Sequence, residues 1–233
     1  MSKIIELDRS VIPACDVPDL ETLAKLVEGT ASVEGIGGYK IGLELVIPFG
    51  MKAVVETIRE KSDLPIIYDH QKAATDIPAL GKKFAAACKG VDAIILFPQA
   101  GPVTEKEWIA AAKEAGFGVI VGGEMTHEGY MESDGGFIRE GAPEKIYEIA
   151  AGNGVSDFVV PGNKPDKIMH YREFLEGKGI EPVFYSPGLV AQGGEITESA
   201  TAAGERWHAI VGRGLYQAAD INAAARELTA KLR

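Results

Sequence analysis

Eight short apolar runs, each followed by a longer segment with helical patterning, limit what this chain can fold into. The runs are continuously apolar, as expected for parallel strands that are buried on both faces. They lie at residues 10–16, 37–42, 65–69, 91–97, 117–124, 156–162, 181–188 and 207–213. Strands that alternate with helices predict an α/β fold with a parallel sheet.

The segments between the runs carry helical signals, and several of them end in glycine, which tolerates the left-handed helix stop. Residues 105–116, for example, place Trp108, Ile109, Ala112 and Ala115 on one face. The expected helices cover residues 18–29, 43–61, 76–90, 105–116, 143–154, 164–179, 195–205 and 214–232. Eight such units predict a closed (β/α)8 TIM barrel over residues 1–233 as one domain, with an open doubly wound sheet as the alternative.

Composition narrows the class of protein. The chain has 233 residues, of which 46% are hydrophobic, so it can bury a sizeable core. Its net charge of −10 disfavours nucleic acid and anionic membranes as partners. Two cysteines without paired spacing, Cys15 and Cys88, and the lack of a long apolar stretch predict a reduced, cytoplasmic protein with no membrane segment.

Polar side chains follow most of the predicted strands, at the end where (β/α)8 barrels carry their active sites. Candidate residues in chain order are Asp16, Lys40, Asp69, Lys72, Asp76, Glu124, Thr126, Gln192 and Arg213. The last two stand in or beside glycine-rich loops, the usual phosphate site of this fold. Backbone N–H groups of Gly193, Gly194, Gly212 and Arg213 could converge on one anion, and the Arg213 guanidinium could bind two of its oxygens. The alternative is that these glycines only turn the chain and that Arg213 pairs with a surface acid.

Two lysines and two carboxylates, Lys40, Asp69, Lys72 and Asp76, alternate at neighbouring strand ends. Opposite charges at short range keep each other ionised, so we expect a nearly neutral array with fixed ammonium groups. No G-x-G-x-x-G, G-x-x-x-x-G-K-[ST], H-x-x-H or C-x-x-C pattern is present, so no cofactor or metal is expected. His70 and His127 are expected to be neutral hydrogen-bonding residues. A lysine proton donor in such a field suits a reaction that develops a carbanion.

Five motifs, "YKIG", "DHQKAATDIP", "EMTH", "SPGLVAQGG" and "IVGRGLY", occur in this order between Asp16 and Arg213. With them the chain resembles the orotidine 5′-phosphate decarboxylases of the short microbial type. The family pattern D-x-K-x-x-D-I appears here as D-x-x-K-x-x-x-D-I-P, with one more residue in each gap. The resemblance implies catalytic roles for Lys40, Asp69, Lys72 and Asp76. It also implies a homodimer with a shared site, because the last aspartate, followed by Ile77, would come from the partner subunit.

The same resemblance implies the substrate contacts. Asp16 would contact the ribose hydroxyls, and Thr126, in place of a serine, would hold the pyrimidine. The loop with Pro187, Gln192 and Gly193 would reach from the base to the phosphate, and Gly212 with Arg213 would bind the phosphate. Leu80 stands where the family has a threonine. Two loops are candidates for a lid over the site: the loop after the fifth strand and the "SPGLVAQGG" loop. We favour the "SPGLVAQGG" loop.

The implied reaction is the cofactor-free decarboxylation of orotidine 5′-monophosphate (OMP) to uridine 5′-monophosphate (UMP), with Lys72 as the proton donor. Three alternatives stay open. A Mg²⁺-dependent sugar-phosphate decarboxylase or synthase of the same superfamily would need a glutamate near the second strand, where Glu34 and Glu44 are poorly placed. A Schiff-base aldolase would need Lys72 or Lys40 unprotonated, and a non-catalytic nucleotide-binding barrel would bind UMP without turning over OMP.

Overall fold

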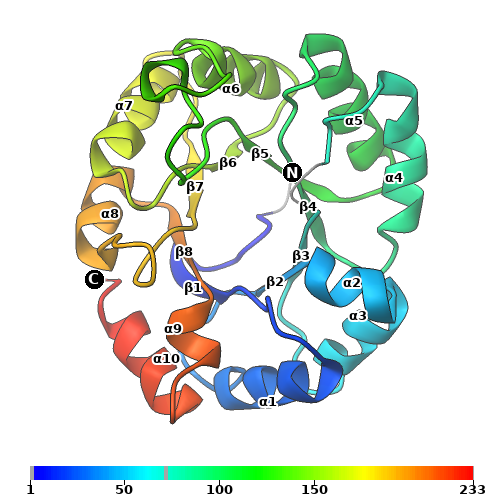
Figure 1. The fold of residues 1–233 in the computed structure, drawn as a ribbon, viewed down its shortest axis with the longest axis vertical. Coiled ribbons are helices and arrows are strands. Elements are labelled where there is room, and N and C mark those ends of the chain that lie inside the picture. Colours follow the sequence, from blue (N-terminus) through cyan, green and yellow to red (C-terminus); the bar gives the residue numbers. More distant parts are fainter. Residues whose placement is uncertain (1–2, 71–72, 233) are drawn as a thin grey trace.

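Eight parallel strands form one sheet that is rolled into a barrel and ringed by helices (Figure 1). The computed structural model describes residues 3–70 and 73–232. The strands are β1 (Arg9–Pro13), β2 (Tyr39–Gly42), β3 (Ile66–Asp69), β4 (Ala93–Leu96), β5 (Gly118–Gly122), β6 (Asp157–Val159), β7 (Val183–Ser186) and β8 (Trp207–Val211). All eight predicted strands are therefore confirmed, each slightly shorter than its apolar run.

The barrel closes where the first and last strands meet. Strand β1 pairs in parallel with β8 along its full length. On its other side the chain is joined to the β2 region by bridges from Val11 to Ile36 and from Ala14 to Lys40. The Cys15 amide also donates to the Lys40 carbonyl at 2.8 Å. The closed TIM barrel is thus confirmed, and the open doubly wound sheet is wrong.

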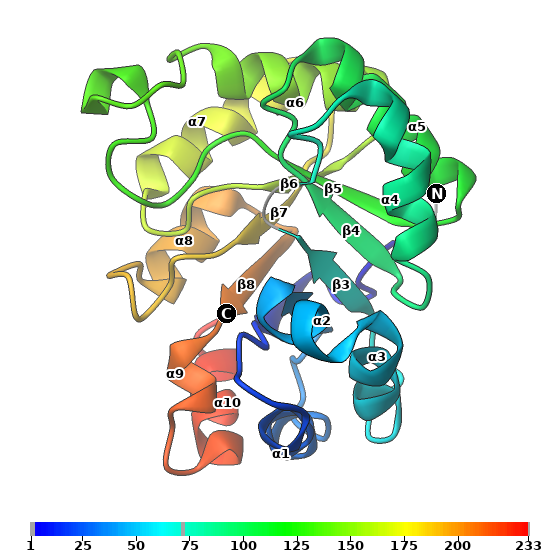
Figure 2. The same ribbon diagram turned by 45° about the vertical axis from the view of Figure 1, so that its right-hand side comes forward.

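The helices occupy the segments between the strands and cover the outside of the barrel, as Figure 2 shows from a second direction. They are α1 (Leu20–Thr30), α2 (Leu43–Phe49), α3 (Met51–Arg59), α4 (Gly81–Ala87), α5 (Pro102–Glu114), α6 (Ala142–Gly152), α7 (Pro165–Glu176), α8 (Ile196–Ala203), α9 (Arg213–Tyr216) and α10 (Ile221–Ala230), with the 3-10 turns η1 (Pro78–Leu80) and η2 (Glu132–Asp134). None of these helices in the described chain has both the length and the apolar character needed to cross a membrane.

Two of the expected helices are each divided in two. The segment 43–61 breaks at Gly50, whose φ of 79° lies in the left-handed region and ends α2 before α3 begins. The segment 214–232 breaks before Asp220, whose side chain accepts a hydrogen bond from the Ala223 amide and caps α10. Both breaks follow from local capping chemistry, which the apolar spacing of the segments does not reveal.

The core has two layers because successive strand residues point to opposite faces. On β4, for example, Ala93 and Ile95 belong to the cluster inside the barrel, whereas Ile94 and Leu96 pack in the layer beneath the helices. Each fully buried isoleucine or leucine side chain of this kind contributes about 1.5–3 kcal/mol. The same alternation decides which polar side chains at the strand ends point into the barrel.

His208 is a polar member of the barrel interior. It lies on β8 with only 1% of its surface exposed, and its Nδ1 is 2.8 Å from the Ser10 hydroxyl oxygen. Burial lowers the pKa of His208 from 6.5 to about 3. Between these two values the unfolded chain binds a proton that the folded chain does not. Protonation of the unfolded chain therefore makes folding less favourable as the pH falls.

We predict that His208→Gln makes the free energy of unfolding fall less steeply as the pH drops below about 6.5. Each pH unit below about 6.5 should cost the wild type about 1.4 kcal/mol more than the variant, because glutamine does not titrate. Urea unfolding at pH 7, 6 and 5 measures this difference as a change in slope, whatever the variant's absolute stability. Parallel stability profiles for the two proteins would contradict a neutral, buried His208.

Candidate active site

A cavity of about 290 Å³ opens at the carboxyl ends of the strands. Every strand, or the segment directly after it, contributes to its wall. The lining residues are Ala14, Asp16, Lys40, Asp69, Ile95, Phe97, Met125, Thr126, Val159, Pro187, Gly188, Leu189, Ala191, Gln192, Ile210, Gly212, Arg213 and Tyr216. A concave site with apolar walls and a few converging polar groups is typical of a small-molecule site.

Among the described residues that line this cavity, Lys40 is the buried cation. Its neighbours Tyr39 and Ile41 pack toward the helices, so alternation along β2 points Lys40 inward. Its ammonium lies 3.4 Å from Asp16 Oδ1 and 3.3 Å from Asp69 Oδ2. Burial alone would lower the pKa of Lys40, but the two carboxylates outweigh burial and raise the pKa above its usual value. The raised pKa favours the protonated form of Lys40 over a nucleophilic amine, which argues against its use as a Schiff-base lysine.

The two carboxylates that flank Lys40 come from different strands. Asp69 ends β3, and the pairing of β2 with β3 brings it beside Gly42, two residues beyond Lys40. Asp16 lies three residues after β1, in the segment that is hydrogen-bonded to β2. The Asp16 side chain is 34% exposed and the Asp69 side chain 16% exposed. The structure thus brings together three of the charged residues that the sequence pointed to.

Lys72, the predicted proton donor, lies outside the described residues, as does Gln71. The described residues beyond them are well anchored. Ala73 and Ala74 are buried, and the Ala73 carbonyl accepts a hydrogen bond from the Phe97 amide at 2.9 Å. Ala74 adopts a φ of 66°, a left-handed conformation that is rare for alanine. The described part of this spacing, residues 73–76, thus includes a strained position at Ala74, and the role of Lys72 stays a prediction.

Asp76 and Ile77 do not line the cavity of their own chain. Asp76 is exposed, and Ile77 exposes 61% of its surface. Helix α5 holds both residues from behind: the Thr104 hydroxyl donates to the Asp76 carbonyl at 3.0 Å, and the Trp108 indole donates to the Ile77 carbonyl at 3.1 Å. The pair is therefore presented outward from a rigid support.

The loop after β7 closes one side of the cavity against Thr126. Gly188 has a φ of 88°, and a Cβ atom there would lie only 2.7 Å from Thr126 Cγ2. The same Cβ would come within 3.4 Å of Gln192 Oε1. Glycine is thus required both for the turn and for this close approach. Pro187 and Gln192 line the cavity as expected, whereas Gly193 does not, and its amide donates to the Val190 carbonyl at 3.3 Å.

The end of β8 supplies the proposed phosphate side. Gly212 follows the strand directly and caps the short helix α9, whose Leu215 is buried and anchors the turn. A side chain on Gly212 would contact Tyr216 and Ala14 at 3.4–3.6 Å. Both Gly212 and Arg213 line the cavity, and their role at a phosphate stays a prediction.

Apolar side chains form the floor and walls, and the sequence did not single them out. Ile95, Val159 and Ile210 point inward from their strands, and Phe97 and Met125 complete the wall. Their signal in the sequence is the two-residue period of the strands, which becomes readable only once the inward face is known. They exclude water from the charged groups and so strengthen the electrostatic interactions there.

The two histidines near the site make contacts of a structural kind. His70 Nδ1 lies 2.6 Å from the Tyr68 hydroxyl, and the His127 ring packs edge-on against Tyr130 at a centroid distance of 5.6 Å. Across residues 3–70 and 73–232, no three side chains of the histidine, cysteine, aspartate and glutamate types come together in a way that could hold a metal ion.

Comparisons with known proteins show the family to which this chain belongs. The family model "Orotidine 5′-phosphate decarboxylase / HUMPS family" matches residues 9–228. The orotidine 5′-phosphate decarboxylase of Pyrococcus abyssi is 31% identical over 227 residues, 96% of this chain and 99% of that protein. That of Methanocaldococcus jannaschii is 31% identical over 205 residues, 88% and 89% of the two chains. A solved structure of the Methanocaldococcus jannaschii enzyme complexed with inhibitor BMP aligns with a TM-score of 0.84 and 27% identity, covering 97% of this chain and 99% of that chain. This chain belongs to the orotidine 5′-phosphate decarboxylase / HUMPS family.

Proposed function

We propose that the cavity at the carboxyl ends of the strands is where this chain, an orotidine 5′-phosphate decarboxylase, converts OMP to UMP. The observation that carries this assignment is the buried Lys40 between Asp16 and Asp69, at 3.4 and 3.3 Å. The family membership supports the reaction. The similar Methanocaldococcus jannaschii enzyme has been solved in complex with the inhibitor BMP. That complex supports a small-molecule site in the barrel of this chain.

The residues that line the cavity suggest one orientation for the nucleotide in this proposal. The phosphate lies against the Gly212 amide and the Arg213 guanidinium, which can bind two of its oxygens. The ribose hydroxyls meet Asp16, and the pyrimidine lies between Thr126 and the inward face of β3. Gln192, on the β7 loop, extends from the base of the nucleotide toward its phosphate. Fixing the phosphate and ribose in this way supplies binding energy that positions the reacting base.

The chemistry follows from the charges around the base. The OMP carboxylate lies beside Asp69 and departs as CO₂, leaving its bonding electron pair on C6 of the pyrimidine. The Lys72 ammonium stabilises this pair and then gives C6 a proton, so UMP forms without a cofactor. At an effective dielectric of about 20, two unit charges ~4 Å apart interact by ~4 kcal/mol. Only the part of this interaction that grows as the charge moves lowers the barrier.

The residues present give less support to the alternative hypothesis, a Mg²⁺-dependent sugar-phosphate decarboxylase or synthase. Glu34 and Glu44 are exposed, and neither lines the cavity. The glutamine-bearing loop after β7, by contrast, does line it. These placements favour a nucleotide substrate whose base and phosphate are both contacted.

A direct assay tests the proposed function. Mixing the protein with OMP should change the ultraviolet absorbance as OMP is consumed, at the same rate with and without a metal chelator. Unchanged absorbance would overturn the assignment. Turnover that the chelator abolishes would instead favour the metal-dependent branch of the superfamily, and UMP binding without turnover would favour a non-catalytic barrel.

The partner subunit completes the site in this proposal. Asp76 and Ile77 face outward from η1 and α5 and do not line their own cavity. Ile77 and Val103 expose 61% and 63% of their surfaces, which supports an interface at this face. We therefore infer a homodimer in which Asp76 of each chain serves the cavity of the other.

Mixed dimers test this sharing. Asp76→Asn and Lys72→Ala are each expected to be inactive alone. Mixing them after reversible subunit exchange should restore part of the activity, because one site of each mixed dimer then combines the intact Lys72 of one chain with the intact Asp76 of the other. The readout is the OMP absorbance assay on the exchanged mixture. No recovery, with exchange verified by mass, would place Asp76 in the site of its own chain.

The loop after β7 is the proposed lid. Val190 and Gln192 are exposed, and the loop folds back through a 2.8 Å hydrogen bond from the Val190 amide to the Gly194 carbonyl. Val190 adopts a φ of 61°, an unfavourable conformation for a β-branched residue. Backbone strain of about 1–3 kcal/mol at such a place supports a loop that changes conformation on binding.

We also propose that residues 1–233 act as a single domain and that the protein is cytoplasmic. The pairing of β1 with β8 joins the two ends of the chain in one barrel, which supports a single unit. Cys15 and Cys88 are buried and unpaired, as expected in a reducing compartment.

A further inference from the structure

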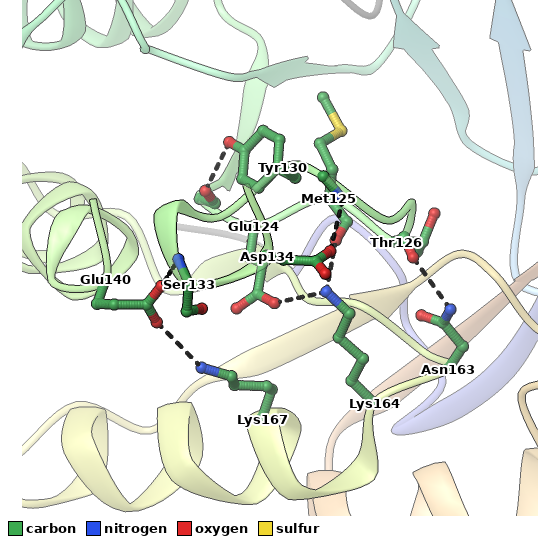
Figure 3. Close-up of polar contacts among 12 residues, drawn as sticks. Glu124, Met125, Thr126, Tyr130, Ser133, Asp134, Glu140, Asn163, Lys164 and Lys167 are labelled. Carbon is green, nitrogen blue, oxygen red and sulfur yellow. Dashed lines mark hydrogen bonds and ion pairs between the residues drawn. The ribbon is translucent and has the colours of Figure 1, made fainter. Parts of the chain in front are cut away.

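Three consecutive residues at the end of β5 are held by side chains from the segment between β6 and α7 (Figure 3). Lys164 Nζ donates to Glu124 Oε1 at 2.8 Å and to the Met125 carbonyl at 3.3 Å. Asn163 Nδ2 donates to the Thr126 carbonyl at 3.1 Å. Met125 and Thr126 line the cavity, but neither Asn163 nor Lys164 does.

The ion pair between Glu124 and Lys164 is held in place by the burial of its carboxylate. The Glu124 side chain is fully buried and also accepts a hydrogen bond from the Tyr171 hydroxyl of α7, whereas the Lys164 side chain is 31% exposed. A buried carboxylate is tolerated only when its oxygens are paired and hydrogen-bonded. Both Glu124 oxygens meet this requirement, so Lys164 is held in one orientation and can fix the Met125 carbonyl.

The same segment also holds the loop after β7, which adjoins Thr126 in the cavity wall. The Gly162 amide donates to the Pro187 carbonyl at 2.8 Å, and the Ser199 hydroxyl donates to the Gly162 carbonyl at 2.7 Å. Residues 162–164 therefore bridge the β5 loop and the β7 loop. Thr126 is held in position by the segment 162–164, through Asn163, and by the β7 loop, through Gly188.

We propose that Asn163 and Lys164 are positioning residues: they fix the Met125–Thr126 backbone so that Thr126 meets the pyrimidine. The proposal rests on the function given above for this cavity, in which Thr126 holds the base. Neither residue touches the nucleotide. They act through the backbone of the β5 loop, where a displacement on the order of 1 Å from the productive geometry can cost as much as ~100-fold in rate.

Lys164→Met tests the proposal because it keeps the length of the side chain and removes its donors. We expect kcat/KM for OMP to fall ~10-fold to ~100-fold and UMP affinity to fall ~10-fold. Ribose 5-phosphate has no base, so it should bind to the Lys164→Met variant as tightly as it binds to the wild type. Lys164→Arg retains donors for Glu124 and Met125 and should recover most of the lost UMP affinity.

Lys167→Met is the matched control. Lys167 lies one turn further along α7, and its Nζ is 4.0 Å from Glu140, with the Lys167 side chain 40% exposed. It has the same chemistry as Lys164, but among the described residues its ammonium is directed at Glu140 and not at residues 124–126, as Figure 3 also shows. Its replacement should leave the affinities for UMP and ribose 5-phosphate unchanged.

A second pair of variants covers the case in which Lys164→Met fails to fold. Asn163→Ala removes the bond to Thr126, and Asn163→Asp places an acceptor against the Thr126 carbonyl and should weaken UMP binding further. Calorimetric titration with UMP and with ribose 5-phosphate is the measurement. Selective loss of UMP affinity supports the proposal. Equal losses for both ligands, or no loss in either Asn163 variant, would overturn it. Because the readout is binding, a wild type that binds UMP but does not consume OMP would overturn the proposed function and leave this test valid.

Discussion

Lys40→Met is expected to lower kcat/KM for OMP by a factor on the order of 10³ or more. The substitution removes the only cation within 4 Å of both Asp16 and Asp69 among the described residues, at present 3.4 and 3.3 Å away. Asp16 and Asp69 would then each lose the contact with this ammonium, and the negative charge around the substrate carboxylate would rise. Breaking a buried ion pair by removing one partner typically costs about 3–5 kcal/mol. Part of this cost should appear as weaker binding of UMP and part as a lower rate.

The measurement combines initial rates of OMP consumption with UMP titration. Lys52→Met is a suitable control because Lys52 on α3 is 87% exposed and pairs loosely with Glu56 at 3.7 Å. A surface pair of this kind contributes little, so the control should match the wild type. Near-normal turnover by Lys40→Met would mean that the charges around Asp69 are balanced by another group and that Lys40 has no role in the reaction.

Lys72→Ala is expected to abolish measurable turnover while sparing UMP binding. Loss of a positioned proton donor alone typically costs 10² to 10⁴ in rate, and loss of its charge beside a developing carbanion adds to this. UMP carries no carboxylate to expel, and its phosphate and ribose contacts come from Gly212, Arg213 and Asp16 in the proposed pose. The pattern to look for is therefore a collapse of kcat with a nearly unchanged UMP dissociation constant.

The same variant tests whether the longer Asp69–Lys72–Asp76 spacing preserves the role of the lysine. Substantial activity in Lys72→Ala would show that another donor protonates C6. A loss of UMP affinity as large as the loss of kcat would show that Lys72 mainly holds the nucleotide. Either result would require the proton donor to be reassigned, although Lys40 and Asp69 would keep their places in the cavity.

Much of the fold follows from the sequence because the barrel is built from strongly patterned local units. Continuous apolar runs predicted all eight strands, and their alternation with helical segments predicted the closed barrel. The helix breaks at Gly50 and before Asp220 were not predicted, because each depends on one glycine or one capping side chain within a long apolar-periodic segment. Apolar spacing reports which face is buried and says little about where a helix ends.

The charged residues of the site were predictable for a geometric reason. Residues that follow parallel strands meet at one end of the barrel, so Asp16, Lys40 and Asp69 were expected to come together. The contacts of Asn163 and Lys164 were not predicted, although "PGNKP" and Glu124 were visible at strand ends. Their partners are backbone carbonyls and a buried carboxylate from the neighbouring strand, and such pairings appear only when the register of β5 and β6 is known.

A crystal structure of the protein with bound UMP is the most direct test of the central assignment. We expect the phosphate within hydrogen-bonding distance of the Gly212 amide and the Arg213 guanidinium, and the ribose at Asp16. The pyrimidine should lie at Thr126 with the Lys72 ammonium directed at C6. A nucleotide bound elsewhere on the barrel, or a Lys72 side chain turned away from the ring, would contradict this assignment.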